Sequence, residues 1–249
     1  MAVVHLLGTG AGFSGPERTT TMLAFESGGH SVVVDCGGDV IQRLLASGLD
    51  PAGIEALIVT HEHPDHVAGF PLFMEKIWLS GRRHPIPVYG IRPALDQARR
   101  AWDAFRTGSW EGVPHIQEHE VRHEAGAPVL ENERWRITAA PGIHGAPVIG
   151  IRVEDVAGSG VCTYSCDTAK SPEITELARG ADLLIHEGTG TTLGGHTTYV
   201  QAAEVARDAD AGRTVLVHLP PGVTDGELAE ARTIHADIRL GEDGARYDF

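Results

Sequence analysis

The sequence predicts an α/β protein in which two mixed β-sheets are flanked by helices. Strand-like apolar runs alternate with helix-like segments along two halves of the chain. The Ser27-Gly28-Gly29 turn joins neighbouring strands as a hairpin, whereas later strands are separated by helices, so antiparallel and parallel pairs occur together. The 31 glycines suit many short strands joined by tight turns.

The first half begins with strands and continues with helices. The apolar run Ala56-Leu57-Ile58-Val59 is typical of a strand that is buried on both faces. The predicted elements are strands over 2–7, 21–26 and 31–35, a helix from Asp39 to Ser47, a strand ending at Thr60, and helices near 71–80 and 92–107.

The second half again contains both strands and helices. Ser171 as cap and Pro172 at the first position open one helix. The segment from Thr198 to Ala209 has helical apolar spacing, and Thr224 caps a last helix. Strands are predicted near 134–139, 147–153, 161–165, 182–186 and 214–217.

A polar stretch from Glu111 to Ala127 lacks apolar periodicity and marks the seam between the halves. His115, His119 and His123 repeat there every four residues, and we interpret them as belonging to a solvated loop or helix face. A chain of 249 residues with 42% apolar content can bury a full core. We therefore expect a single domain over 1–249, built of two similar halves (about 1–125 and 126–249).

Composition also indicates the cellular compartment in which the protein is expected. Cys36, Cys162 and Cys166 are odd in number and lie in apolar contexts, which favours free thiols in a reducing compartment over a disulfide framework. The N-terminus has no basic region followed by a long apolar run, and no stretch approaches the roughly 20 apolar residues of a membrane span. We expect a soluble, cytoplasmic protein without a membrane partner.

The formal net charge is −14, which argues against a surface that tracks a nucleic-acid backbone. Bound divalent metals would reverse the field locally and still attract a small anionic substrate. The apolar stretch from Phe70 to Leu79 fits either the core or a homodimer interface, and burial in the core is the commoner outcome.

The run from His61 to His66 packs three imidazoles and two carboxylates into six residues, directly after a buried strand. Imidazole nitrogen and carboxylate oxygen are ligands that zinc and related metals prefer. A solvated polar loop is the alternative, but clustered histidines beside a buried strand would be unfavourable unless something coordinates them. Four potential ligands in one loop can serve two ions.

Other polar groups also follow buried strands, which is where convergent sites form in sheet proteins. His144 lies in a Gly- and Pro-rich turn, and Asp167 and His218 each follow an apolar run. His186 and Glu187 end another strand, and His196 precedes a helix. Taken singly, His186 fits a core histidine and Thr197 or Thr198 a helix cap.

The motif His-x-His-x-Asp-His, present as His61, His63, Asp65 and His66, resembles the signature of the metallo-β-lactamase superfamily. The resemblance covers essentially the whole chain and implies a four-layer αββα sandwich with metals at one edge between the sheets. It also implies two ligand sets, His61, His63 and His144 for the first metal and Asp65, His66 and His218 for the second, with Asp167 bridging both.

Within that superfamily the sequence looks most like the ribonuclease Z branch of phosphodiesterases. The matching motifs are Leu7-Gly-Thr-Gly-Ala-Gly12, Asp35-Cys-Gly-Gly-Asp39, Tyr164-Ser-Cys-Asp-Thr168, His186-Glu-Gly-Thr189 and Gly195-His-Thr-Thr198. In that branch the motif Glu, here Glu187, orients the motif His, here His196, which works near the scissile phosphate.

Two features depart from that branch. Its tRNA-processing enzymes insert a long flexible arm between the third ligand His and the bridging Asp, but His144 and Asp167 are only 23 residues apart. The last ligand is followed by Leu219-Pro-Pro-Gly222 and not by the usual Ser-Pro-Arg-Tyr. With the acidic charge, these departures argue against tRNA 3′ processing and long nucleic acids, and favour a small-molecule or nucleotide phosphodiester.

The chemistry of such a site follows from two ions about 3.5 to 4 Å apart, which would lower the pKa of a bridging water toward roughly 7. The resulting hydroxide is the expected nucleophile. Asp65 would bind metal and orient that water, and His196 would serve as general acid, with Glu187 raising its pKa. Zinc is the default metal, and manganese or iron also fit the ligand types.

Two rival classes remain. A lactonase, thioesterase, sulfatase or β-lactamase could use the same scaffold, although His196 with Glu187 argues against the carbonyl versions. A noncatalytic metal-binding regulator would be expected to have an incomplete ligand set, whereas all seven ligands are present here.

Overall fold

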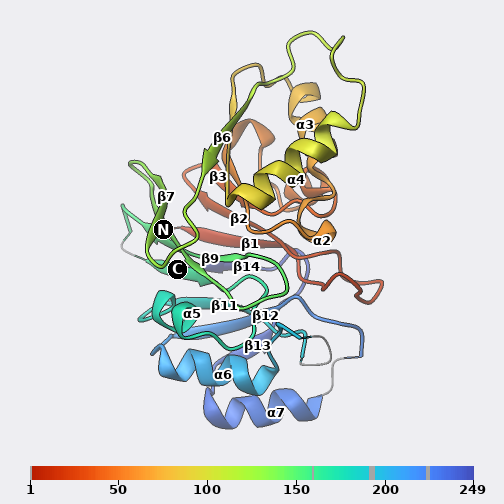
Figure 1. The fold of residues 1–249 in the computed structure, drawn as a ribbon. Helices are drawn as coiled ribbons and strands as arrows, with labels where there is room; N and C mark the ends of the chain where they lie inside the picture. The colour runs from red at the N-terminus through yellow and green to blue at the C-terminus, as the bar shows by residue number, and fades with distance from the viewer. Residues whose placement is uncertain (1, 159, 191–193, 223–224) are drawn as a thin grey trace.

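The computed structural model describes residues 2–158, 160–190, 194–222 and 225–249. In this part of the chain two seven-stranded sheets pack face to face, and helices cover the outer face of each sheet (Figure 1). The predicted α/β class with two mixed, helix-flanked sheets is confirmed, and the layers follow the expected αββα order.

The first sheet is antiparallel on one side and parallel on the other. Its strands pair antiparallel from β14 to β3 and parallel from β3 to β6. In spatial order they are β14 (Arg246–Asp248), β1 (Val3–Gly8), β2 (Met22–Ser27), β3 (His30–Val34), β4 (Ile54–Val59), β5 (Ile86–Gly90) and β6 (Ile116–Glu120).

The second sheet has the same mixed character. It is parallel from β13 to β10 and antiparallel from β10 to β7. Its spatial order is β13 (Ile238–Leu240), β12 (Arg213–Val217), β11 (Leu183–Glu187), β10 (Val161–Tyr164), β9 (Ile149–Asp155), β8 (Trp135–Pro141) and β7 (Ala127–Glu131).

Helices lie on the two outer faces, as Figure 1 shows. On the side of the first sheet these are α1 (Val40–Ala46), the 3₁₀ turn η1 (Pro51–Gly53), α2 (Pro64–Val67), α3 (Phe70–Leu79) and α4 (Arg92–Asp103). On the side of the second sheet they are α5 (Pro172–Leu177), α6 (Tyr199–Asp208) and α7 (Asp225–Ile234). Between the sheets, Phe25 and Ile58 of the first belong to one buried cluster with Ile151 and Ile185 of the second.

Local sequence signals explain several boundaries. Gly28 and Gly29 have φ angles of 60° and 81°, a conformation that glycine tolerates, and they close the β2–β3 hairpin. Ser171 Oγ accepts from Ile174 N–H at the start of α5. Thr198 and Gln201 form a capping box at the start of α6. The predicted cap Thr224 lies outside the described residues.

The interpretation of the three histidines as part of a solvated loop or helix face holds for His115 and His123, which are exposed and outside helices and strands. It is wrong for His119, because residues 116–120 form the edge strand β6, paired in parallel with β5. An edge strand has a polar, exposed side, so its apolar alternation is weak over five residues. His119 stacks on Tyr89 of β5, with ring centroids 4.5 Å apart. The chain does pass from the first sheet to the second here, between β6 and β7.

The stretch from Phe70 to Leu79 is mainly core. Phe70, Phe73, Met74 and Ile77 of α3 are buried, and Leu79 at the end of the helix is exposed. The three cysteines are free and buried, as expected. Among the described residues, no helix has both the length and the apolar character needed to cross a membrane.

Candidate metal centre

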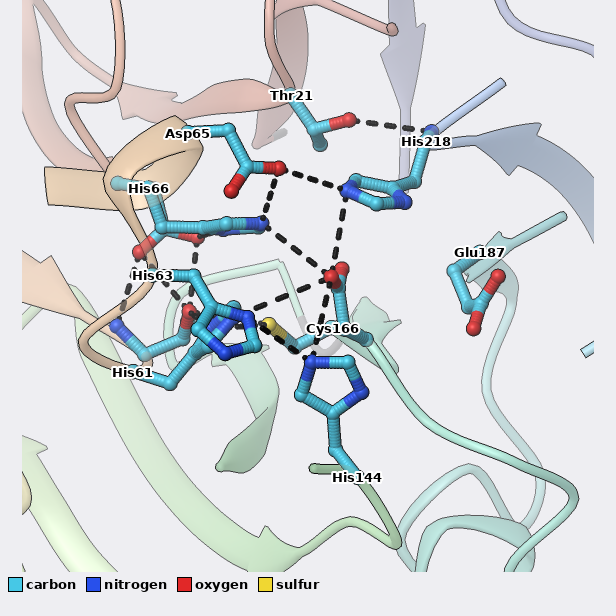
Figure 2. A network of polar contacts seen from close by, with 12 residues as sticks. Thr21, His61, His63, Asp65, His66, His144, Cys166, Glu187 and His218 are labelled. Atoms are coloured by element: carbon cyan, nitrogen blue, oxygen red, sulfur yellow. Dashed lines mark hydrogen bonds and ion pairs between the residues drawn. The ribbon is translucent and has the colours of Figure 1, made fainter. Parts of the chain in front are cut away.

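The polar groups that follow buried strands come together at one edge between the sheets. The loop from His61 to His66 follows β4, His144 follows β8, Asp167 follows β10, and His218 follows β12. Figure 2 shows His61, His63, Asp65, His66, His144 and His218 pointing toward one another from these different segments.

One group of potential ligands consists of His61, His63, His144 and Asp167, whose ligand atoms lie within 4.8 Å of one another. His144 Nε2 is 3.1 Å from His63 Nδ1. His61 Nε2 and His144 Nε2 are each 3.9 Å from Asp167 Oδ2. Three imidazole nitrogens and one carboxylate oxygen at this spacing are typical of a site for a first-row divalent metal.

A second group consists of Asp65, His66, Asp167 and His218, again with ligand atoms within 4.8 Å. His218 Nε2 lies 3.2 Å from Asp65 Oδ2 and 3.3 Å from Asp167 Oδ2. His66 Nε2 is 3.5 Å from each of these carboxylate oxygens. Asp167 therefore belongs to both groups, and the structure brings all seven predicted ligand residues together.

Four of the histidines share a hydrogen-bond pattern that orients them for coordination. In each, the Nδ1–H donates to a protein oxygen, so Nε2 keeps a free lone pair that faces the cluster. The acceptors are Thr60 Oγ1 for His61 at 3.2 Å, Asp35 Oδ2 for His66 at 2.8 Å, Gly195 O for His144 at 2.9 Å, and Thr189 Oγ1 for His218 at 2.6 Å.

Several of these atoms are buried without any hydrogen-bond partner. They are His61 Nε2, His66 Nε2 and Asp167 Oδ1. A buried polar atom without a partner costs free energy, and a metal ion would satisfy all three atoms at once. The residues present thus fit divalent metal ions, and the cluster indicates binding of such ions.

The electrostatics agree with a coordinated cation. Burial, with His66 nearby, lowers the pKa of His61 to about 2, so its imidazole is neutral. Burial raises the pKa of Asp65, but hydrogen bonds to His218 and His66 outweigh it and hold the pKa well below its usual value. Burial lowers the pKa of His66, but Asp167 and Asp35 outweigh it and raise the pKa. The carboxylates therefore favour positive charge at their centre.

Glu187 and His196 lie beside this cluster. The fully buried Glu187 carboxylate accepts from His196 Nδ1–H at 3.0 Å, Thr197 N–H at 3.0 Å and Thr189 N–H at 2.8 Å. Burial lowers the pKa of His196, but the hydrogen bond and charge of Glu187 outweigh it and raise the pKa. The His196 ring lies 4.9 Å from that of His144 and 5.6 Å from that of His218, between centroids.

The cluster opens into a cavity of about 770 Å³, within the size range of small-molecule sites. Its lining combines polar and apolar residues. The lining residues are Ala11, Gly12, Phe13, His63, Asp65, His144, Asp167, Thr189, His196, His218, Pro220 and Pro221.

Three residues of the site region have unusual backbone conformations. Asp35, Cys166 and His218 have φ angles of 61°, 53° and 56°, which are uncommon for residues other than glycine. Each directly follows or nearly follows the end of a central strand. Such conformations cost energy and cluster at functional sites, where they turn a side chain in a direction that regular backbone does not reach.

Sequence reasoning identified Glu187 as the residue that orients His196, but it assigned no such role to the residues that hold the ligand histidines. Asp35 accepts from Thr60 N–H and from His66, and Thr189 fixes His218. The sequence does contain a signal for Asp35, because this residue directly follows the buried strand β3, just as the predicted metal ligands follow buried strands. His186 donates from Nδ1 to the Glu187 carbonyl and is not among the residues that line the cavity. His115, His119 and His123 also lie outside its lining.

Comparison with known proteins agrees with this architecture. Residues 30–219 match the family described as the beta-lactamase superfamily domain. The ribonuclease Z of Methanothermobacter thermautotrophicus is 29% identical, over 88% of this chain and 87% of that protein.

Two solved structures are also similar. The metallo-beta-lactamase fold protein YhfI from Bacillus subtilis has a TM-score of 0.82 at 25% identity, covering 99% of this chain and 98% of the other. The short form of human tRNase Z has a TM-score of 0.81 at 24% identity, covering 100% and 99%, and this likeness concerns the fold.

Proposed function

The chain belongs to the beta-lactamase superfamily, and on that premise we propose that this metal-dependent hydrolase is a dinuclear phosphodiesterase of the ribonuclease Z-like kind. One observation carries the proposal. Two ligand groups that share Asp167 open into the same cavity as the hydrogen-bonded pair of His196 and Glu187. Zinc is the proposed metal because imidazole and carboxylate ligands suit it, and manganese or iron are the alternatives.

The proposed ligands are those brought together in the two groups. His61, His63 and His144 would hold one ion, Asp65, His66 and His218 the other, and Asp167 both. Ions bound there would supply an activated water as nucleophile and positive charge opposite the charge that develops on the phosphoryl oxygens. The hydrogen bonds to Asp35 and Thr189 keep His66 and His218 in the orientation that this requires.

Asp65 has a second proposed role. Its carboxylate stays ionised at neutral pH and lines the cavity, so it can accept a hydrogen bond from the attacking water and orient it.

His196 is the proposed general acid. Its Nδ1–H is held by Glu187, so Nε2 is the nitrogen that can carry a proton to the leaving oxygen. Glu187 favours the protonated imidazole, which keeps that proton available at neutral pH. A general acid of this kind assists an alkoxide leaving group such as that of a phosphodiester, whereas the thiolate released from a thioester leaves without a proton, so the pair supports phosphodiester over thioester hydrolysis.

A small or nucleotide phosphodiester is the proposed substrate. The segment between His144 and Asp167 is taken up by the hairpin strands β9 and β10, which leaves no space in the sequence for an extended arm. The net charge of −14 does not favour a long polyanion.

Hydrolysis of bis(p-nitrophenyl) phosphate by metal-loaded and chelated protein tests the proposal. We expect metal-dependent turnover with about two bound metal ions per chain. The Asp167→Asn variant should lose both bound metal and turnover, because the substitution weakens both ligand groups. The control is Asp96→Asn, which replaces an exposed carboxylate on α4 and should behave as wild type. Turnover of lactone, thioester, sulfate or β-lactam substrates without any diester hydrolysis would contradict it.

A further inference from the structure

The lining of the cavity includes apolar residues beside the potential metal ligands. Ala11, Gly12 and Phe13 from the β1–β2 connection form an apolar wall together with Pro220 and Pro221, which follow β12. Phe13 is 81% exposed, more than any other large hydrophobic residue among those described. A single exposed hydrophobic residue is ordinary on a protein surface. This one lies in the lining of the metal cavity.

The apolar wall is held in place by the backbone. Ala11 N–H donates to Leu219 O at 3.1 Å, and Leu219 N–H donates to Thr9 O at 3.0 Å, so the two connections are tied to each other. Gly12 lies against the ligand side, because a Cβ added there would be 3.0 Å from Asp65 Oδ2. Pro220 and Pro221 restrict the backbone further. The phenyl ring of Phe13 is thus presented on an anchored segment beside Asp65.

The charge of the lining restricts what can lie against this wall. Among the described residues that line the cavity there is no Lys or Arg. A phosphate beyond the one at the ligand cluster would meet no compensating cation, and leaving a charge without a partner is unfavourable. A neutral planar ring, in contrast, can stack on an exposed phenyl face.

We propose that Phe13, supported by Pro220 and Pro221, binds a planar ring on the ester group that remains attached to phosphorus. The inference rests on the proposed phosphodiesterase function and narrows its substrate class to monophosphate diesters that carry a nucleobase or aryl ring. The proposed acid His196 is held by Glu187 and lies beside His144, and there the leaving oxygen receives its proton. Because the leaving group is taken up at His196, the retained ester group is the one that can extend to the Phe13 wall beside Asp65.

Two esters with the same leaving group test this assignment. Bis(p-nitrophenyl) phosphate retains an aryl ring and methyl p-nitrophenyl phosphate retains none, while both release p-nitrophenolate. Phe13→Ala should lower kcat/KM for the bis-aryl ester by about 5- to 100-fold, mainly through KM, and leave the methyl ester unchanged. Phe13→Trp should restore the preference, and Phe105→Ala, an exposed phenyl outside the cavity, should match wild type.

Binding of the products gives a readout that does not depend on turnover. By calorimetry, p-nitrophenyl phosphate should bind wild type more tightly than methyl phosphate does, and Phe13→Ala should remove this difference. Equal losses on both esters, or no loss on either, would overturn the role of Phe13 while leaving the phosphodiesterase function intact. Absence of turnover of both esters by metal-loaded wild type would instead overturn the proposed function, and this inference with it.

Discussion

At the scale of single residues, the centre is organised by groups that contact the histidines and not by the histidines alone. Each of His61, His66, His144 and His218 has its Nδ1–H bound to a protein oxygen, which leaves Nε2 for a metal. His196 is oriented in the same way, because its Nδ1–H is bound to the Glu187 carboxylate. The proton positions of five imidazoles are therefore set by neighbouring groups, and for all but His61, which is held by the adjacent Thr60, that group lies elsewhere in the chain.

The general-acid role of His196 predicts a dependence on the leaving group. His196→Ala should lower kcat for thymidylyl-thymidine by about 10²- to 10⁴-fold, because the departing alkoxide needs a proton. The loss should be much smaller for the p-nitrophenyl ester of thymidine 5′-phosphate, since p-nitrophenolate leaves without protonation. Steady-state kinetics on both esters measure the difference. His84→Ala, at an exposed histidine outside the cavity, is the control, and equal losses on the two esters would refute the role.

The contact between Thr189 and His218 predicts an effect on metal affinity. Thr189 accepts from His218 Nδ1–H and donates to the His218 carbonyl. Thr189→Val keeps the shape but removes both bonds, so we expect metal affinity to fall by about 10- to 100-fold. Titration against a competing chelator measures it. Thr175→Val in α5, away from the cavity, should bind metal as wild type does, and an unchanged affinity in Thr189→Val would contradict the argument.

At the scale of secondary-structure elements, the site depends on parallel strands that end at the same edge. β3 and β4 are parallel neighbours in the first sheet, and β10, β11 and β12 are parallel neighbours in the second. Their carboxyl ends supply Asp35, the loop from His61, Asp167, Glu187 and His218. The capping box at the start of α6 fixes the chain directly after His196.

The edge strand β6 is linked to α4 by an ion cluster, and this predicts a pH-dependent stability. Burial raises the pKa of Glu118, but hydrogen bonds from Arg92 and Arg99 outweigh it and lower the pKa below its usual value. Such a carboxylate stabilises the fold above the pKa of the unfolded state, about 4.3, and the contribution is lost as pH falls through the folded pKa.

Glu118→Gln should therefore lower the free energy of unfolding by about 0.5 to 1 kcal/mol at neutral pH, since the cluster is partly exposed and screened. The difference from wild type should shrink as the pH falls below about 4. Urea denaturation at several pH values measures it. Glu131→Gln, which removes one exposed pair with Arg136, should change little, and a pH-independent effect at Glu118 would contradict the assignment.

At the scale of the whole molecule, contacts between distant parts of the chain join the two sheets. Strand β14 lies at the edge of the first sheet beside β1, although it follows the second sheet in sequence. The Phe249 ring packs edge-on against Phe25 with centroids 5.9 Å apart, and Ala2 N–H donates to Asp155. We propose on these grounds that residues 1–249 behave as a single domain.

A single domain whose metal cluster draws on both sheets should unfold in one transition that depends on metal. Binding to the native state alone stabilises it by RT ln(1 + [L]/Kd), about 4 kcal/mol at a thousandfold excess over Kd. Differential scanning calorimetry should show one peak, which chelation moves to lower temperature. Two separated peaks would contradict the single domain, and a Tm unaffected by chelation would contradict the metal cluster.

The sequence by itself determined the elements and the ligand types. The run from His61 to His66 and the apolar strand before it are local patterns, as are the cap at Ser171 and the hairpin at Gly28. Such features depend on neighbouring residues, so periodicity and residue chemistry are enough to predict them. The strands β5, β6, β7, β13 and β14 were not among the predicted elements. The edge strand β6 was missed because its five residues alternate weakly and its outer side is polar.

Only the tertiary structure decided which groups contact one another. Asp35 lies 31 residues from His66, and Thr189 lies 29 residues from His218, yet each pair forms a hydrogen bond. Phe13 belongs to none of the sequence motifs, and its proposed role in binding follows from its position in the wall of the cavity. These relations depend on how strands from both sheets end at one edge, and that arrangement comes from packing across the whole core, which no local pattern encodes.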